Sequence, residues 1–357
     1  MPLIRKQFQC LMAGALAVCA TLEAKSLTLQ DAPKQADSKP SASATPQDGS
    51  FEKATHLMQQ GKNDEALALL ESIAAAEPGR HGVMRQIGIA NYRKGDFLKA
   101  ATSFQKALAE DPADNEAIQL MGLSYYLSGR PAEAIGPLEK VQTWYPSANV
   151  DAAYILGVCY IQTKDYPAAR RAFAKMFGVP GDSAASYVVT ARMLLRQDFA
   201  PIAAEYAKKA VEIDPKLPLA HSLLGEIYLY KSRFPEAIEQ FQKELELNPA
   251  DAAAYYKLAD GYSRVQKFEE AERLLQCSIW LDATSTGPYI LLGKVLEKKG
   301  ETALAVRALQ RALAMDPNNP VPHHLLGQAY RELGQTEEAD RELKLSEQLQ
   351  SRQNAKP

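Results

Sequence analysis

Cysteine and tryptophan are scarce in this sequence. Its 357 residues include four cysteines and two tryptophans. Cys10 and Cys19 lie within the first twenty residues, which leaves only Cys159 and Cys277 in the rest of the chain. Two thiols cannot form the disulfide framework of a small secreted fold. We therefore expect both remaining cysteines to be small, buried, apolar residues rather than a bridge or a metal site.

The sequence also lacks an excess of charge of either sign. It has 41 basic and 43 acidic residues, a formal net charge of −2, and 46% of its residues are hydrophobic. Nucleic-acid-binding proteins normally show a basic excess, so the composition disfavours that class. After the first twenty residues no segment is apolar enough to cross a membrane. What remains is the composition of an ordinary globular protein.

The N-terminal segment differs from the rest of the chain. Arg5 and Lys6 precede a short apolar run, CLMAGALAVCA, which ends at Ala20. This pattern is typical of a secretory signal peptide, and the run is too short to span a bilayer. We predict a signal peptide over residues 1–20 and an exported protein, periplasmic or secreted, with an uncleaved anchor as the alternative. Residues 21–50 lack aromatic side chains and are predicted to form a disordered linker.

No arrangement of residues typical of catalysis is present in the sequence. The five histidines do not combine with other side chains at the spacing of a catalytic triad or a metal site, and there is no phosphate-binding loop. His323 and His324 are adjacent, and adjacent residues of a helix face different directions. We therefore predict a non-catalytic protein without a cofactor or a metal.

The dominant feature of the sequence is an internal repeat. Alanine recurs every 34 residues, with one step of 35 between Ala168 and Ala203. The recurring alanines are Ala66, Ala100, Ala134, Ala168, Ala203, Ala237, Ala271, Ala305 and Ala339. Glycines precede six of them by about twelve residues: Gly88, Gly122, Gly157, Gly225, Gly293 and Gly327. A fixed period of this length indicates stacked copies of one small structural unit.

Each period has room for two short helices. Within residues 218–251, the stretches LAHSLLGEIYLYK and FPEAIEQFQKELEL both place apolar residues three and four positions apart, which favours two amphipathic helices. A glycine inside a helix costs about 1 kcal/mol relative to alanine, so a recurring glycine implies a compensating close approach of the paired helix. The recurring alanine is the expected matching surface on the second helix.

This pattern resembles the tetratricopeptide repeat (TPR), as in LLGEIYLYKSRFPEAIEQFQKELELNPAD and LLGQAYRELGQTEEA. The resemblance implies an all-α fold, a right-handed α-solenoid of antiparallel helix pairs, over residues 51–353, with 354–357 as a tail. It implies eight to nine repeats, of which the first and last are degenerate or capping. The fifth repeat, 184–217, has Ala191 in place of the glycine and follows the 35-residue step, so we expect local irregularity there.

By the same resemblance, four positions on the first helix of each repeat face a concave groove. The apolar residues at these positions are Ile89, Tyr92, Leu123, Tyr126, Leu127, Val158, Ile161, Leu195, Leu229, Tyr230 and Tyr256. Contiguous apolar surface of this kind is typical of an interaction site. In the fifth repeat, Arg192 and Arg196 are candidates for contact with an acidic group. Tyr125, next to Tyr126, occupies the repeat's own tyrosine position and is expected to pack between helices.

The predicted function is an exported scaffold or adaptor that holds peptide segments of other proteins in this groove, in envelope assembly or secretion. Two alternatives remain open: a self-associating array, and an accessory protein for polysaccharide export or binding. We do not expect nucleic acid as a partner, and we do not expect a membrane-spanning segment in the mature chain.

Overall fold

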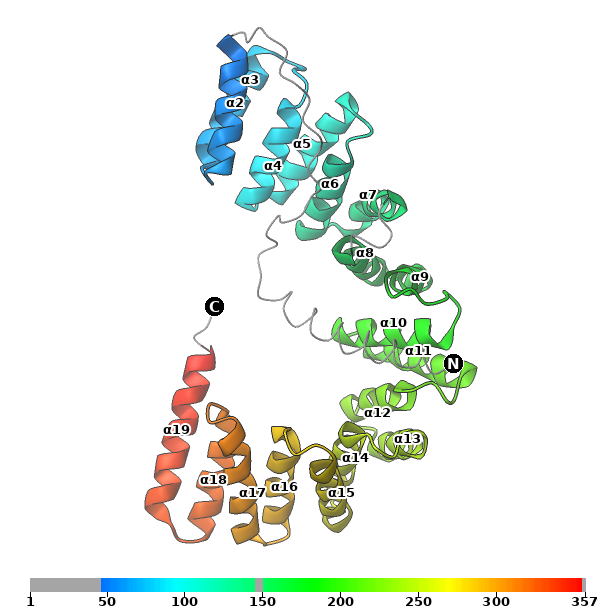
Figure 1. Cartoon of the computed structure of the whole chain (residues 1–357), viewed down its shortest axis with the longest axis vertical. Coiled ribbons are helices and arrows are strands. Elements are labelled where there is room, and N and C mark those ends of the chain that lie inside the picture. Colours follow the sequence, from blue (N-terminus) through cyan, green and yellow to red (C-terminus); the bar gives the residue numbers. More distant parts are fainter. Residues whose placement is uncertain (1–45, 145–149, 355–357) are drawn as a thin grey trace. The chain divides into compact units, whose positions relative to one another are not determined.

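A computed structural model of the chain describes residues 46–144 and 150–354. The predicted signal peptide and nearly all of the predicted linker lie outside these ranges. The described residues form eighteen α-helices and no strand, arranged as consecutive pairs (Figure 1). The expected all-α stack of helix pairs is therefore confirmed. No described helix is both long and apolar enough to cross a bilayer.

The helices belong to two compact units that divide after Gly178. The N-terminal unit contains four helix pairs, and each helix packs against the next. Its helices are α2 (Pro46–Gln59), α3 (Asn63–Ala76), α4 (Val83–Lys94), α5 (Phe97–Glu110), α6 (Asn115–Leu127), α7 (Pro131–Trp144), α8 (Val150–Gln162) and α9 (Tyr166–Met176).

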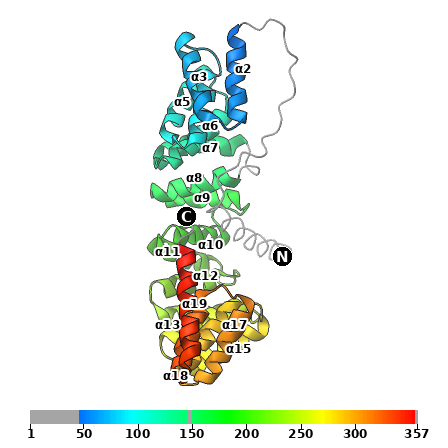
Figure 2. The same ribbon diagram turned by 90° about the vertical axis from the view of Figure 1, so that its left-hand side faces the viewer.

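The C-terminal unit, from Val179 onward, contains five helix pairs. Its helices are α10 (Ala184–Arg196), α11 (Ala200–Ile213), α12 (Ala220–Tyr230), α13 (Phe234–Leu247), α14 (Ala252–Arg264), α15 (Phe268–Leu281), α16 (Thr286–Lys298), α17 (Thr302–Met315), α18 (Pro320–Glu332) and α19 (Thr336–Asn354). The last pair, α18 and α19, lies side by side at the C-terminal end of this unit (Figure 2).

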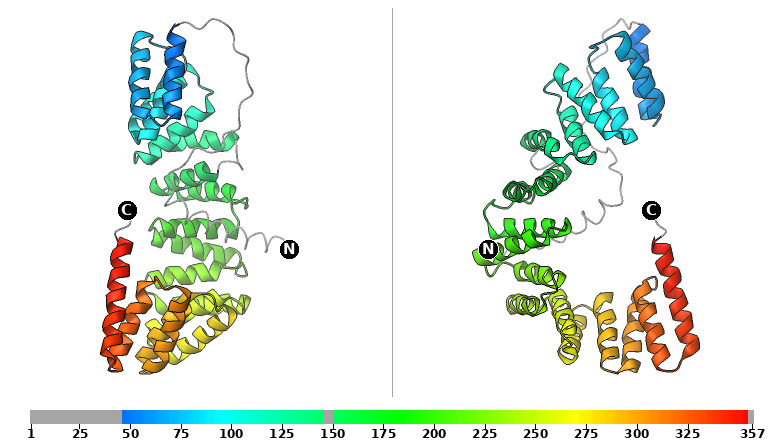
Figure 3. Two further views of the ribbon diagram at one scale, coloured as in Figure 1. Left: turned by 60° about the vertical axis from the view of Figure 1, so that its left-hand side comes forward. Right: turned by 180° about the vertical axis from the view of Figure 1, so that it is seen from behind.

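Within each unit the first helices of successive pairs also touch. In the N-terminal unit α2 contacts α4, α4 contacts α6 and α6 contacts α8, and in the C-terminal unit the same holds from α10 through α18. The ribbon views show this regular stacking of pairs within either unit (Figure 3). Each unit therefore has one face that is formed by its first helices alone, here called the first-helix face.

The recurring glycines allow a large side chain of the second helix to lie against the backbone of the first. A Cβ atom at Gly88 would come within 2.6 Å of the Phe104 ring, and one at Gly225 within 2.7 Å of the Phe241 ring. Both phenylalanines are fully buried. In each case the contacting residue follows the glycine by sixteen positions, which confirms the close approach expected from the sequence.

This contact corrects the position of the extra residue in the repeat. Gly157 meets Phe173, again sixteen residues on, so the alanine twelve residues after this glycine is Ala169 rather than Ala168. The 35-residue step therefore lies between Gly122 and Gly157. Two adjacent alanines fit the alanine pattern equally well, and the ring contact, together with the 35-residue spacing of Gly122 and Gly157, distinguishes them. The fifth repeat follows a regular step, and its two helices, α10 and α11, are uninterrupted.

The turn between the two helices of each pair contains one residue with positive φ. These residues are Gly61, Gly95, Gly129, Lys164, Asp198, Ser232, Gln266, Gly300 and Gly334. They lie 34 residues apart except for one step of 35 between Gly129 and Lys164, in agreement with the corrected register. Four of the nine are not glycine and carry the cost of a side chain in the left-handed region.

We expect Gln266→Gly to stabilise the C-terminal unit by about 0.5–1 kcal/mol, because Gln266 is exposed with φ of 61° and glycine adopts this conformation without a steric penalty. Gly300→Ala, at the equivalent turn with φ of 78°, should have the opposite effect. Urea unfolding followed by circular dichroism measures both changes. A loss of stability in Gln266→Gly would contradict the strain at this turn.

Candidate functional site

The first-helix face of the N-terminal unit contains a cavity of about 210 Å³ between α2, α4 and α6. Its lining residues are Thr55, Met58, Gln59, Arg85, Gln86, Ile89, Tyr92, Arg93, Glu116 and Leu120. Three successive first helices therefore contribute to one hollow, as the stacking of repeats requires. Of the predicted groove residues, Ile89 and Tyr92 are brought together here.

The floor of this cavity is apolar. Met58, Ile89 and Leu120 come from three different helices and are all buried. Tyr92 is half-buried, its ring meets Phe97 edge-on at 5.6 Å between centroids, and burial raises the pKa of its hydroxyl. Tyr92 therefore presents a rigid apolar ring wall and stays protonated at neutral pH.

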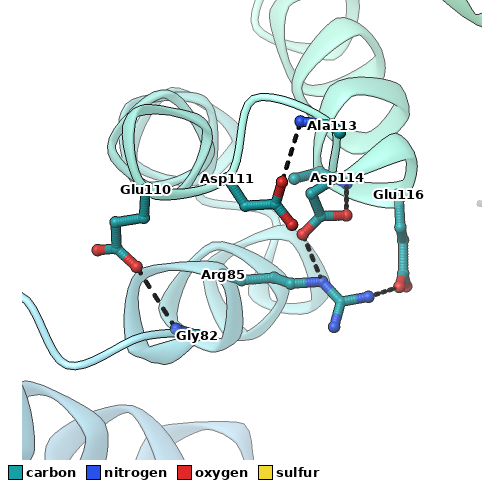
Figure 4. Close-up of polar contacts among 8 residues, drawn as sticks. Gly82, Arg85, Glu110, Asp111, Ala113, Asp114 and Glu116 are labelled. Atoms are coloured by element: carbon teal, nitrogen blue, oxygen red, sulfur yellow. Dashed lines mark hydrogen bonds and ion pairs between the residues drawn. The ribbon is translucent and has the colours of Figure 1, made fainter.

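The rim of the cavity is polar and held by ion pairs. Arg85 Nε lies 2.9 Å from Asp114 Oδ2, and the guanidinium also contacts Glu116 (Figure 4). Arg93 donates a hydrogen bond of 2.9 Å to the carbonyl oxygen of Met58. Because Arg85 already has two acidic partners, it does not offer a free positive charge to a ligand. The cavity is thus an apolar hollow with a neutralised rim.

Three other predicted groove residues of the N-terminal unit are covered. Leu123, Val158 and Ile161 are buried. They pack within the stack, because neighbouring first helices lie close together. This placement corrects the expectation that they offer open apolar surface.

The two adjacent tyrosines of α6 are both half-buried. Arg130 lies over the ring of Tyr125, 5.7 Å from its centroid. Burial, followed by the influence of Tyr154 and Cys159, raises the pKa of Tyr126. Tyr126 therefore packs towards α8 as well as towards the groove, whereas its neighbour Leu127 is 39% exposed.

In the C-terminal unit the first-helix face begins with partly covered apolar residues. Leu195, Leu229 and Tyr256 are half-buried, while Tyr230 is 62% exposed. The hydroxyl of Tyr230 donates a hydrogen bond of 2.5 Å to Asp198 Oδ1, which holds the ring at the surface. Further along, on α16 and α18, the exposed side chains include the polar residues Lys294, Lys298 and Gln328, while Val321 is 44% exposed.

The same face carries an uneven set of charges. Lys257 on α14 contacts Glu226 on α12, and Arg264 Nε lies 3.2 Å from Asp260 Oδ1. Arg192 on α10 has no such acidic partner among the residues described, and its Nε atom is buried without a hydrogen-bond acceptor. Sequence reasoning identified Arg192 but missed Lys257, because the repeat's own groove positions do not include it.

The two remaining cysteines have different environments. Cys159 is buried, and burial raises the pKa of its thiol to about 12, as expected for an inert core residue. Cys277 is exposed, which corrects the expectation that it is buried. The second helix α15 turns this position outward. In the described ranges no group of His, Cys, Asp and Glu is arranged to hold a metal ion.

Four family models match the chain. Models described as tetratricopeptide repeat match residues 51–115 and 296–354, and a TPR repeat model matches 225–265. A model of anaphase-promoting complex, cyclosome, subunit 3 matches residues 93–176. Together with the helix pairs, these matches show that the chain contains tetratricopeptide repeats.

Several solved structures are similar to this chain. MamA 41-end from Desulfovibrio magneticus RS-1 is 20% identical, with 49% of this chain and 98% of that chain covered and a TM-score of 0.46. YrrB, described as a TPR protein with an unusual peptide-binding site, is 22% identical, with 51% of this chain and 94% of that chain covered and a TM-score of 0.43. The APC/C hetero-tetramer Cut9–Hcn1 is 20% identical, with 79% of this chain and 55% of that chain covered and a TM-score of 0.43. No curated protein matches this sequence.

Proposed function

We propose that the protein is a non-catalytic scaffold that holds peptide segments of partner proteins on its first-helix faces. The cavity between α2, α4 and α6 is the observation that carries this proposal. An apolar floor with a polar rim suits a partner peptide that inserts one apolar side chain into the cavity while its backbone stays near water.

The size of the cavity favours a peptide over a small-molecule ligand. Sites for drug-sized ligands and cofactors occupy roughly 300–1,000 Å³, whereas this cavity measures about 210 Å³. A single large apolar side chain of a partner fits the smaller volume. The binding surface then continues along the face to Tyr126 and Leu127. The signal peptide predicted from residues 1–20 supports a role outside the cytoplasm, in envelope assembly or secretion.

Filling the cavity tests this proposal. Gln86 lines the cavity and is half-buried, so Gln86→Trp should occupy the space that a partner side chain needs. Lys106→Trp, on the exposed surface of α5, is the matched control. We expect affinity purification from envelope extracts of the source organism to recover partners with the wild type and the control, but not with Gln86→Trp.

Circular dichroism should show the same helix content for all three proteins. Equal recovery of every partner with Gln86→Trp would contradict the proposal. A stable dimer in sedimentation that Gln86→Trp disrupts would instead indicate self-association through this face.

A further inference from the structure

The first-helix face of the C-terminal unit has more positive than negative charge. Helices α10, α12 and α14 touch in sequence along this face. These three helices carry four basic residues, Arg192, Arg196, Lys257 and Arg264, against two acidic residues, Glu226 and Asp260, and a third acidic residue, Asp198, follows in the turn after α10. Both acidic residues already contact a basic partner: Glu226 contacts Lys257, and Asp260 pairs with Arg264.

Two arginines are therefore left without a counter-charge. Arg192 and Arg196 lie one helical turn apart on α10, and neither forms an ion pair within the described chain. The Nε atom of Arg192 is buried and donates to no acceptor there. The nearby carboxylate of Asp198 accepts a hydrogen bond from the hydroxyl of Tyr230 instead.

An unpaired charge in this position is unfavourable for the folded protein. Arg192 is half-buried, and a charged group that is shielded from water without a partner loses hydration and gains no compensating attraction. Burial, and then the charge of Arg196, lower the pKa of Arg192, which means that the charged form of this side chain is disfavoured here. Burial and the charge of Arg192 likewise lower the pKa of Lys257 to about 8, although Lys257 contacts the carboxylate of Glu226. An anion bound here would relieve both groups.

We propose that Arg192 and Arg196, supported by Lys257, form a binding site for the carboxylate groups of an acidic peptide segment. The planar guanidinium group suits bidentate contact with a carboxylate. Leu195, Leu229 and the exposed ring of Tyr230 lie on the same face and give an apolar surface beside the charges. The expected ligand is therefore a segment in which acidic residues alternate with apolar ones. This site rests on the proposed function, peptide binding by the first-helix faces, but it lies in the C-terminal unit and does not involve the cavity between α2, α4 and α6.

Fluorescence anisotropy of the full chain with two labelled peptides tests this site. One peptide contains glutamate and leucine, and the other has every glutamate replaced by glutamine. The wild type should bind the glutamate peptide at least about tenfold more tightly, and this preference should weaken as salt is raised. Arg192→Met should reduce affinity for the glutamate peptide by about tenfold or more, while Arg273→Gln, an exposed arginine of α15, should leave it unchanged.

The unfolding temperature distinguishes recognition from loss of structure. Because Arg192→Met removes an uncompensated charge but keeps the aliphatic volume, it should raise the unfolding temperature by a few degrees while it weakens binding. Equal affinity of the wild type for both peptides would overturn the proposal, as would Arg192→Met with unchanged affinity. Gln86→Trp, which fills the N-terminal cavity, should bind the glutamate peptide normally, so failure of one site is distinguishable from failure of the other.

Discussion

Replacing Gly225 by alanine should destabilise the C-terminal unit by about 1–3 kcal/mol, although alanine is the better helix former. The added Cβ atom would lie 2.7 Å from the ring of Phe241, which is fully buried and has no room to move. Overpacking therefore outweighs the gain of about 1 kcal/mol in helix propensity. Urea unfolding followed by circular dichroism measures the change.

A double-mutant cycle isolates this contact. Phe241→Ala alone should cost about 3–5 kcal/mol, because it leaves a cavity in the core of the pair. In that background Gly225→Ala should become neutral or favourable by up to about 1 kcal/mol, since the collision is gone. Gly136→Ala on α7 is the control, because its Cβ would meet nothing within 4 Å. An equal loss from Gly225→Ala with and without Phe241 would show that the contact does not require the glycine.

Glu244→Leu should also lower the free energy of unfolding, by about 3 kcal/mol. Glu244 on α13 is fully buried, and its carboxylate accepts hydrogen bonds from the backbone N–H of Leu219 at 3.0 Å and of Ser222 at 3.1 Å. These bonds satisfy the N-terminus of α12, which otherwise lacks a side-chain cap. Leucine would leave two N–H groups without an acceptor in a buried position.

The matched variant Glu244→Gln keeps one acceptor oxygen and should cost about 1–2 kcal/mol, less than the leucine variant. Thermal unfolding of the three proteins gives the order wild type, glutamine, leucine. If Glu244→Leu were as stable as the wild type, the carboxylate would not be the cap of α12. Because α12 carries Glu226, Leu229 and Tyr230, this cap also positions part of the proposed acidic-peptide site.

The fold class followed from the sequence because its evidence is local and repeated. Nine alanines and six glycines recur at fixed positions of the period and indicate where two helices approach, and so many copies in phase exclude coincidence. The register was harder to determine. Ala168 and Ala169 both fit an alanine position, and the contact of Gly157 with Phe173, together with the 35-residue spacing of Gly122 and Gly157, shows that the extra residue comes earlier.

The candidate sites were harder to predict from the sequence than the fold class. Ile89 and Tyr92 line the N-terminal cavity, whereas Leu123, Val158 and Ile161, which the repeat pattern assigned to the same groove, are buried. Exposure at a groove position depends on how closely the next first helix packs, and the sequence of one repeat does not contain that distance.

The sequence by itself determined the period, the helix pairs and the glycines that bring six of the nine pairs together, because these depend on spacing along the chain. The tertiary structure decided which groove residues are covered, where the apolar hollow opens, and which charges find partners. The physical reason is that burial and ion pairing depend on residues about 31 to 35 positions away, in the neighbouring repeat, as in Lys257 with Glu226. Arg192 appeared in the sequence as one half of an arginine pair, and only the structure shows that its Nε atom is buried without a hydrogen-bond acceptor in the described chain.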